Sequence, residues 1–267
     1  MHYFVHRAEE TTPSRPPILM IHGAGGSSLT WHPHVRRLRG ETVYAPDLPG
    51  HGQSEGDGRQ SIGEYADDVV RFMDAANIRA AVFAGISMGS AVALALALNH
   101  PQRVAALVLI GGGAKMRVAP SILEGVGNPE TFEAAVKTIN GNFFSNASPD
   151  LLRLSEQGLQ KTDPSVLLGD FLACDPFDVA NRLAEIKIPA LILCGEHDRM
   201  MPPKFSRALR DGIPNARLSI IENAGHMAQL ERPDAVADAM MQFLDDLPPP
   251  SAPQPDSTPQ TFSSKSA

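Results

Sequence analysis

The stretch Gly85-Ile86-Ser87-Met88-Gly89 places one hydroxyl between two glycines, after an apolar run and before a run of small residues. A Gly-x-Ser-x-Gly spacing is typical of a serine nucleophile on a sharp strand-to-helix turn, where larger side chains would collide. The bare pentapeptide also fits a tight turn with a polar tip. Because the apolar pattern predicts a strand before it and a helix after it, we favour Ser87 as a nucleophile held in a strained turn.

Two further residues match the partners that such a serine needs. A serine hydroxyl is a weak nucleophile, so it requires a general base, and the base requires a carboxylate that orients it. In this topology the chain order is serine, then acid, then histidine, each at the carboxyl end of a strand. Asp198 and His226 follow the last two apolar runs in that order. We therefore predict a triad of Ser87, His226 and Asp198, with Glu196 as the alternative acid.

The tetrahedral intermediate of acyl transfer needs N–H donors that face its oxyanion. The backbone N–H of Met88, directly after Ser87 at the start of the predicted helix, is expected to be one donor. The second is expected from the loop after the first buried strand, where Ala24 is the first choice and Gly25 the alternative. This chemistry needs no metal and no organic cofactor, so we expect neither.

The glycine-rich loop 23–28 also partly matches a dinucleotide-binding fingerprint, in which an acidic residue follows about 20 positions later. Asp47 occupies that place. Against this alternative, Ser28 stands at the third glycine position, no helix clearly opens at once, and Asp47 lies in a turn-rich loop. A P-loop is excluded because no Gly-Lys-Ser/Thr follows. Close approach of the backbone to a reacting carbonyl explains these glycines better.

The elements that must position these residues follow from the apolar pattern. Apolar runs bounded by turn residues predict strands at 2–6, 17–22, 42–45, 80–84, 104–110, 189–194 and 217–221. Helical spacing predicts helices at 62–76, 88–99, near 203–211 and at about 233–246. Strands that alternate with helices indicate the α/β class, with a mostly parallel central sheet and helices on both faces.

Residues 114–186 interrupt this alternation. They contain no convincing strand but several helical patterns, one of them over 129–139. We predict a helical cap at 114–186, inserted into an α/β core that comprises residues 1–113 and 187–247. From 248 to 267, Pro, Ser, Gln and Thr dominate, which predicts a disordered tail because such a composition buries too little apolar surface to fold.

The composition is that of an ordinary soluble globular protein, since 43% of the 267 residues are hydrophobic and 20% are charged. A net charge of −7 without a Lys/Arg cluster argues against a nucleic-acid partner. No apolar run approaches the roughly 18 residues of a membrane span, and no secretory signal opens the chain, so we expect no membrane association and a cytoplasmic location. Cys174 and Cys194 are expected to be free thiols. The oligomeric state is not readable from the sequence.

Five motifs in this order resemble those of the α/β-hydrolase superfamily. They are His22-Gly23, Asp47-Leu48-Pro49-Gly50-His51-Gly52-Gln53-Ser54, Gly85-Ile86-Ser87-Met88-Gly89, Gly195-Glu196-His197-Asp198 and Gly225-His226. The similarity runs over nearly all of residues 1–247. Within the superfamily, the chain is similar to the group of small-cap carboxylesterases, enol-lactonases and cofactor-free haloperoxidase-like proteins. The resemblance implies the α/β-hydrolase fold with a cap of helices over the serine.

Departures from other members narrow the expected activity. Because the nucleophile is Ser87 rather than an aspartate, the resemblance argues against haloalkane dehalogenase and epoxide hydrolase activity. Hydrolases that cleave carbon–carbon bonds of ring-cleavage products share the serine turn. They usually carry a fuller glycine–proline loop after His-Gly and a tryptophan soon after the catalytic histidine. This chain has Ala24-Gly25-Gly26-Ser27 and Met227-Ala228-Gln229-Leu230 at these places, so that activity is the second choice.

We therefore expect a serine hydrolase that cleaves a small-molecule carboxylic ester or lactone through an acyl-enzyme. The modest cap favours short or medium acyl chains. The alternatives are a carbon–carbon-bond hydrolase and a slow-turnover sensor that binds a ligand in the same pocket. Side chains that could line the pocket, with core packing an equally good explanation for each, are Leu29, Trp31, Phe143, Phe144, Phe171 and Met227.

Overall fold

One sheet of seven strands runs through the part of the chain that the computed structural model describes, residues 1–8 and 15–248. The strands are β1 (Tyr3–His6), β2 (Ile18–Ile21), β3 (Val43–Pro46), β4 (Ala81–Ile86), β5 (Val104–Ile110), β6 (Ala190–Gly195) and β7 (Ala216–Ile221). Their order is β1-β3-β2-β4-β5-β6-β7, and every neighbouring pair is parallel except β1 with β3. The predicted α/β fold with a mostly parallel sheet is confirmed.

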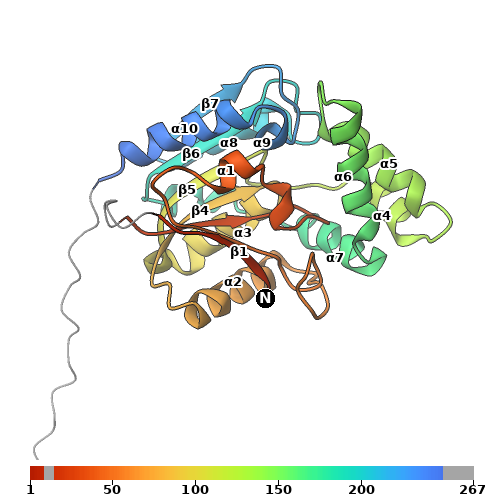
Figure 1. Ribbon diagram of the computed structural model, residues 1–267, viewed down its shortest axis with the longest axis horizontal. Helices are drawn as coiled ribbons and strands as arrows, with labels where there is room; N and C mark the ends of the chain where they lie inside the picture. The colour runs from red at the N-terminus through yellow and green to blue at the C-terminus, as the bar shows by residue number, and fades with distance from the viewer. Residues whose placement is uncertain (9–14, 249–267) are drawn as a thin grey trace, which may run out of the picture.

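Helices connect the strands and cover the sheet (Figure 1). The α-helices are α1 (Pro33–Arg36), α2 (Ile62–Ala75), α3 (Met88–Asn99), α4 (Pro120–Gly127), α5 (Phe132–Phe143), α6 (Pro149–Lys161), α7 (Pro164–Cys174), α8 (Pro203–Gly212), α9 (Ala228–Glu231) and α10 (Pro233–Asp245). Short 3-10 helices are η1 (Ser28–Thr30), η2 (Pro101–Arg103) and η3 (Ala180–Glu185). The predicted strands and helices occur at the predicted places, with ends that differ by a few residues.

The sheet divides the apolar core into two halves. Along β4, Phe83 faces the half that contains α2 and α3, whereas Val82 and Ala84 face the half that contains α1 and α10. This alternation follows from the period of two in a strand. Because helices cover both faces, the side chains of β2, β3 and β4 are buried along their whole length. The same burial explains why these strands are continuous apolar runs in the sequence.

The four helices α4 to α7 all lie between β5 and β6 in the sequence, and they gather on one side of the molecule, away from α10 (Figure 1). The chain enters and leaves this segment at neighbouring points, because Lys115 pairs with Asp178 in an isolated antiparallel bridge. The two side chains also form an ion pair at 2.7 Å. We propose that residues 114–186 act as the cap predicted from the sequence.

Other expectations meet the structure in different ways. The predicted tail, residues 248–267, lies outside the described residues apart from Pro248. Cys174 and Cys194 are both buried free thiols. Within residues 1–8 and 15–248, no helix combines the length and the apolar character needed to cross a bilayer.

The burial of the central strands gives a direct test of the core. Leu107, on β5, is fully buried, whereas Leu154, on α6, is 58% exposed. We expect Leu107→Ala to lower the free energy of unfolding by about 2–5 kcal/mol, because it leaves a cavity in a packed interior. Leu154→Ala is the matched control and should cost less than about 0.5 kcal/mol. Urea denaturation measures both, and equal losses in the two variants would contradict this packing.

Candidate active site

The predicted functional residues lie beyond the carboxyl ends of parallel strands, which meet at one edge of the sheet. Ser87 directly follows β4, Asp198 follows β6, and His226 follows β7. The loop 22–26 follows β2, which is the neighbour of β4. In open α/β sheets, ligands bind outside this edge.

Ser87 has the backbone conformation of a strained turn. Its φ is 53° and its ψ is −119°. Among the described residues, the other non-glycine residues with positive φ are two asparagines, a residue type that tolerates this region. A Cβ on Gly85 would collide with the backbone of Gly89, and a Cβ on Gly89 would collide with the carbonyl oxygen of Ile21. The two glycines are therefore required by the close packing of the turn, as the sequence predicts.

Asp198 and His226 form a buried hydrogen-bonded pair. Nδ1 of His226 lies 2.9 Å from Oδ2 of Asp198, and the two residues are 1% and 3% exposed. The other carboxylate oxygen of Asp198 accepts the backbone N–H groups of Met200 at 2.9 Å and Met201 at 2.8 Å. Since the carboxylate accepts a hydrogen from Nδ1, the lone pair of the ring is on Nε2.

Ser87 and His226 both line one cavity of about 620 Å³. No hydrogen bond joins them, and Nε2 of His226 is buried without a partner in the described part of the chain. Hydrogen bonds of catalytic groups are often long in unliganded proteins and tighten when substrate binds. Glu196, the alternative acid, is exposed and accepts the N–H of Asn223 at 3.2 Å, whereas the carboxylate that contacts His226 is that of Asp198.

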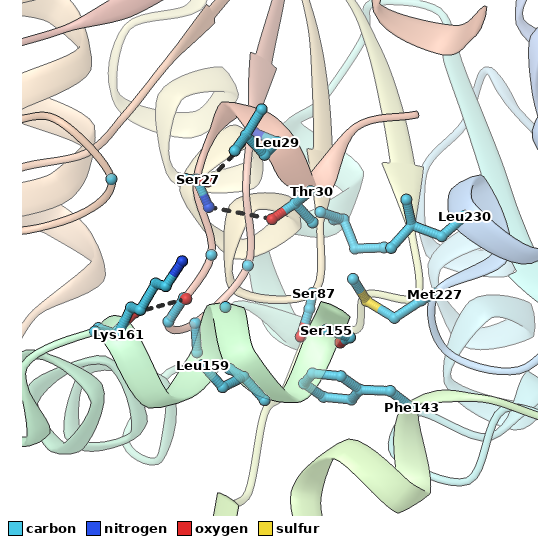
Figure 2. Close-up of a pocket in the computed structure, with 18 of the residues that line it drawn as sticks. Ser27, Leu29, Thr30, Ser87, Phe143, Ser155, Leu159, Lys161, Met227 and Leu230 are labelled. Carbon is cyan, nitrogen blue, oxygen red and sulfur yellow. Dashed lines mark hydrogen bonds between the residues drawn. The ribbon is translucent and has the colours of Figure 1, made fainter. Parts of the chain in front are cut away.

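The cavity wall combines the core with the helices α5 to α7. Figure 2 shows Ser87 between the loop of Ser27 and Thr30, the α6 side chains Ser155 and Leu159, and the pair Phe143 and Met227. Of the side chains predicted to line a pocket, Leu29, Phe143, Phe171 and Met227 do so.

Trp31 and Phe144, for which the sequence left pocket lining and core packing open, do not line the cavity. Both side chains belong to the buried core half that contains α1 and α10, and Trp31 is fully buried there. For these two residues, core packing is the correct explanation.

The two predicted oxyanion donors are placed differently around the cavity. Ala24 lines it, in the loop after β2. Met88 is the first residue of α3, and its side chain is fully buried in the core. Met88 is not among the residues that line the cavity, and within residues 1–8 and 15–248 neither N–H donates a hydrogen bond to a protein acceptor.

Comparison with known proteins identifies the family. Residues 18–239 match the sequence model of the Alpha/beta hydrolase family. The chain belongs to this family. The expected membership of the α/β-hydrolase superfamily is thus confirmed, and hydrolysis is the class of reaction that goes with it.

Relatives of this α/β hydrolase have diverse names. The chain is 28% identical over 246 residues to a putative carbamate hydrolase, RutD, of Azorhizobium caulinodans, covering 86% of this chain and 92% of that protein. It is 30% identical over 244 residues to the 2-hydroxymuconate semialdehyde hydrolase of Pseudomonas putida, covering 85% and 86%. The solved enol-lactonase of Burkholderia xenovorans LB400 matches with a TM-score of 0.83 at 27% identity, covering 92% and 96%.

Several buried histidines and carboxylates of this α/β hydrolase had no role predicted from the sequence. His22 accepts the N–H of Leu48 at Nε2 and contacts the carbonyl of Gly23 at Nδ1, so it is a neutral ring with the proton on Nδ1. Asp170 falls within the predicted helical segment 114–186 and is fully buried. A carboxylate in the otherwise apolar stretch Val166–Cys174 is the signal that could have identified it.

Asp47, considered above as a dinucleotide ligand, accepts hydrogen bonds from backbone N–H groups of its own loop and of the segment after β2. Its carboxylate receives the N–H groups of Ser28 at 2.6 Å and Gln53 at 3.0 Å. Burial opposes its ionisation, but these hydrogen bonds outweigh burial and lower the pKa of Asp47. In the described ranges, no cluster of three or more His, Cys, Asp or Glu side chains is arranged to hold a metal ion.

His22 and His51 change the free energy of unfolding in opposite directions as the pH changes. Burial, followed by the nearby His51, lowers the pKa of His22 to about 4. Between pH 6.5 and 4 the unfolded chain therefore binds a proton at this site that the folded chain does not, so acidification destabilises the fold. His51 has a raised pKa, and the stability that it contributes is lost only as the pH rises above 6.5.

We expect the free energy of unfolding to fall by about 1–2 kcal/mol between pH 7 and pH 5 because of His22 alone. The variant His22→Gln cannot bind this proton, so its fall over the same window should be smaller by that amount. Chemical denaturation at the two pH values measures the difference. An identical fall in both proteins would show that His22 is not a depressed, neutral histidine.

Proposed function

We propose that this α/β hydrolase cleaves a carboxylic ester or lactone through an acyl-enzyme formed on Ser87. The observation that carries the proposal is the strained Ser87 turn on the wall of a cavity that also exposes the His226 side of a buried His226–Asp198 pair. A structural role explains neither the strain at Ser87 nor the buried Nε2 without a partner.

Each group has one task in the proposed reaction. Nε2 of His226 takes the proton of the Ser87 hydroxyl as the oxygen attacks the carbonyl carbon. Asp198 holds the ring in the tautomer with its proton on Nδ1 and stabilises the imidazolium that forms. The N–H groups of Ala24 and Met88 donate to the oxyanion. His226 then gives its proton to the leaving alcohol oxygen and activates a water molecule, which releases the acid.

The lining of the cavity supports a neutral, partly apolar substrate. Apolar side chains from both parts of the protein surround Ser87, among them Phe143, Phe171 and Met227. Of the described residues that line the cavity, Lys161 is the one lysine and no arginine is present, and Lys161 is exposed. A buried carboxylate on the substrate would need a charged or hydrogen-bonding partner near Ser87. An ester or lactone carbonyl needs only the two backbone N–H groups.

A second candidate is cleavage of a carbon–carbon bond in a ring-cleavage product. The relative from Pseudomonas putida named 2-hydroxymuconate semialdehyde hydrolase favours it, at 30% identity. The same serine, histidine and aspartate would serve, and the substrate would be a dienoate with a carboxylate. The two candidate functions differ in the charge of the substrate: an ester or lactone is neutral, whereas the dienoate brings a negative charge into the cavity.

The first test removes one group at a time. Ser87→Ala should abolish nearly all turnover of p-nitrophenyl acetate, and Asp198→Asn should lower kcat by about 10⁴-fold because the ring adopts the wrong tautomer. Glu196→Gln, on the same loop as Asp198, is the matched control and should keep wild-type activity. Circular dichroism verifies folding, and a fluorophosphonate probe should label wild type but not Ser87→Ala. Full activity of Ser87→Ala would refute the proposal.

The second test compares substrates. We expect p-nitrophenyl acetate and butyrate and a simple lactone to be turned over at about 1–10³ s⁻¹, with a 2-hydroxy-6-oxo-dienoate far slower. The reverse ranking would identify a carbon–carbon-bond hydrolase. Slow turnover of every substrate, combined with binding, would identify a ligand sensor.

A further inference from the structure

Asp170 connects the cap to the loop that follows β2. It lies on α7, is 0% exposed, and meets donors from three separate segments of the core. Oδ2 accepts the N–H of Gly25 at 2.7 Å and contacts Nε2 of His51 at 2.8 Å. Oδ1 accepts the hydroxyl of Tyr65. A carboxylate so deeply buried is stable only when its oxygens are matched in this way.

The surroundings of His51 favour its protonated form. Its Nδ1 lies 3.0 Å from the carbonyl oxygen of Pro49, and its Nε2 faces Asp170. Pro49 offers an acceptor to one ring nitrogen and the Asp170 carboxyl faces the other, an arrangement that favours a proton on both nitrogens. Burial lowers the pKa of His51, but the Asp170 carboxylate outweighs burial and the net pKa is raised. The cap and the core therefore share a fully buried His51–Asp170 pair, with Nε2 and Oδ2 2.8 Å apart.

Hydrogen bonds hold the peptide planes on both sides of Ala24. The carbonyl of Gly23 accepts Nδ1–H of His22 at 2.8 Å and the N–H of Gly26 at 3.0 Å. Because a peptide unit is planar and trans, fixing that carbonyl also fixes the opposite direction of the Ala24 N–H. The next peptide unit is fixed by Asp170, which accepts the N–H of Gly25.

The cap holds Gly25 from a second residue as well. The hydroxyl of Thr162, directly after α6, donates to the Gly25 carbonyl at 2.9 Å. The rings of His51 and His22 lie 4.8 Å apart between centroids, so the His51–Asp170 pair also borders the ring that orients Gly23. Asp170 and Thr162 from the cap and His22 from the core thus hold this loop in one shape.

We propose that Asp170 is a positioning residue for the oxyanion site, and that by holding Gly25 and His51 it aims the Ala24 N–H at the reacting carbonyl oxygen. The inference rests on the proposed function, since it assigns a task to the donor used there. It also means that the oxyanion site is built jointly by the core and the cap. Misplacement of a reacting group by about 1 Å from a remote change can cost about 100-fold in rate.

The variant Asp170→Asn keeps the size of the side chain and removes its charge. We expect kcat for p-nitrophenyl acetate to fall about 10- to 100-fold, because the loop is no longer held in one shape. KM should change little, because the oxyanion forms only in the transition state. Measurements are made at a temperature where circular dichroism shows the variant to be folded.

A tetrahedral analogue separates positioning from a purely structural role. A short-chain trifluoromethyl ketone adds to the serine oxygen and places an oxyanion at the site, whereas the matched trifluoromethyl alcohol cannot form this adduct. In Asp170→Asn, the inhibition constant of the ketone should rise by the same factor as the loss in kcat/KM. The constant of the alcohol should stay unchanged. If Asp170 only stabilised the fold, neither kcat/KM nor the inhibition constant of the ketone would change in the folded variant.

Asp68→Asn is the matched control. Asp68, on α2, is also a buried carboxylate, 5% exposed and paired with Arg59 at 2.7 Å, but it does not contact the loop 22–26. We expect it to lower stability while leaving kcat and both inhibition constants at wild-type values. If Asp170→Asn does not fold, Thr162→Val removes the other hydrogen bond from the cap to Gly25. It should lower kcat and ketone affinity together, about three- to tenfold.

The outcomes separate the two proposals. Suppose that the wild-type protein turns over esters and that folded Asp170→Asn has the same kcat and ketone affinity. This result overturns the positioning role and leaves the proposed function intact. If Asp170→Asn does not fold, the same result in Thr162→Val has the same meaning. A wild-type protein that neither turns over esters nor binds the ketone overturns the proposed function and this inference with it. Parallel loss of kcat and ketone affinity, with Asp68→Asn unaffected, supports the inference.

Discussion

The close packing of the turn between β4 and α3 is the constraint on which the rest of the site depends. A serine with φ of 53° costs about 1–3 kcal/mol and persists only if its surroundings leave no alternative. The Ser87 N–H donates to the carbonyl of Ile110 at 2.9 Å, and the Ser90 hydroxyl lies 2.7 Å from the carbonyl oxygen of Gly85. Because α3 is buried over most of its length, the turn cannot relax without moving the core. The fold therefore holds the Ser87 hydroxyl at the cavity wall.

Contacts within the core hold some residues of the candidate site, and contacts from the cap hold others. The Ser87 turn and the His226–Asp198 pair are held within the core, by strand ends and backbone N–H groups. The loop 22–26 is held from the core by His22 and from the cap by the buried carboxyl of Asp170 and the hydroxyl of Thr162. Replacing a buried ion pair by apolar residues is often neutral for stability. The position of Asp170 is therefore better explained by what it orients than by what it stabilises.

Much of the fold was predictable because the information is local. Strands such as 104–110 are apolar runs ended by glycines, and the order of serine, acid and histidine follows from the order of strand ends. The role of Asp170 was not predictable, because its partners Gly25, His51 and Tyr65 are more than 100 residues away in the chain. The sequence left pocket lining and core packing open for Trp31 and Phe144 for a related reason. Apolar side chains next to a site face either the cavity or the core, and tertiary packing decides which.

The bridge between Lys115 and Asp178 has a consequence for how such proteins diversify. Since the two ends of the inserted segment meet, its length and sequence can change without pulling the sheet apart, and a longer insertion adds little closure entropy. New substrate pockets can therefore arise by exchanging one continuous stretch of chain. The exchange is not entirely free in this protein. A replacement segment would have to bring its own acceptor for the Gly25 N–H and its own partner for His51, so the inserted segment would carry part of the proposed active site with it.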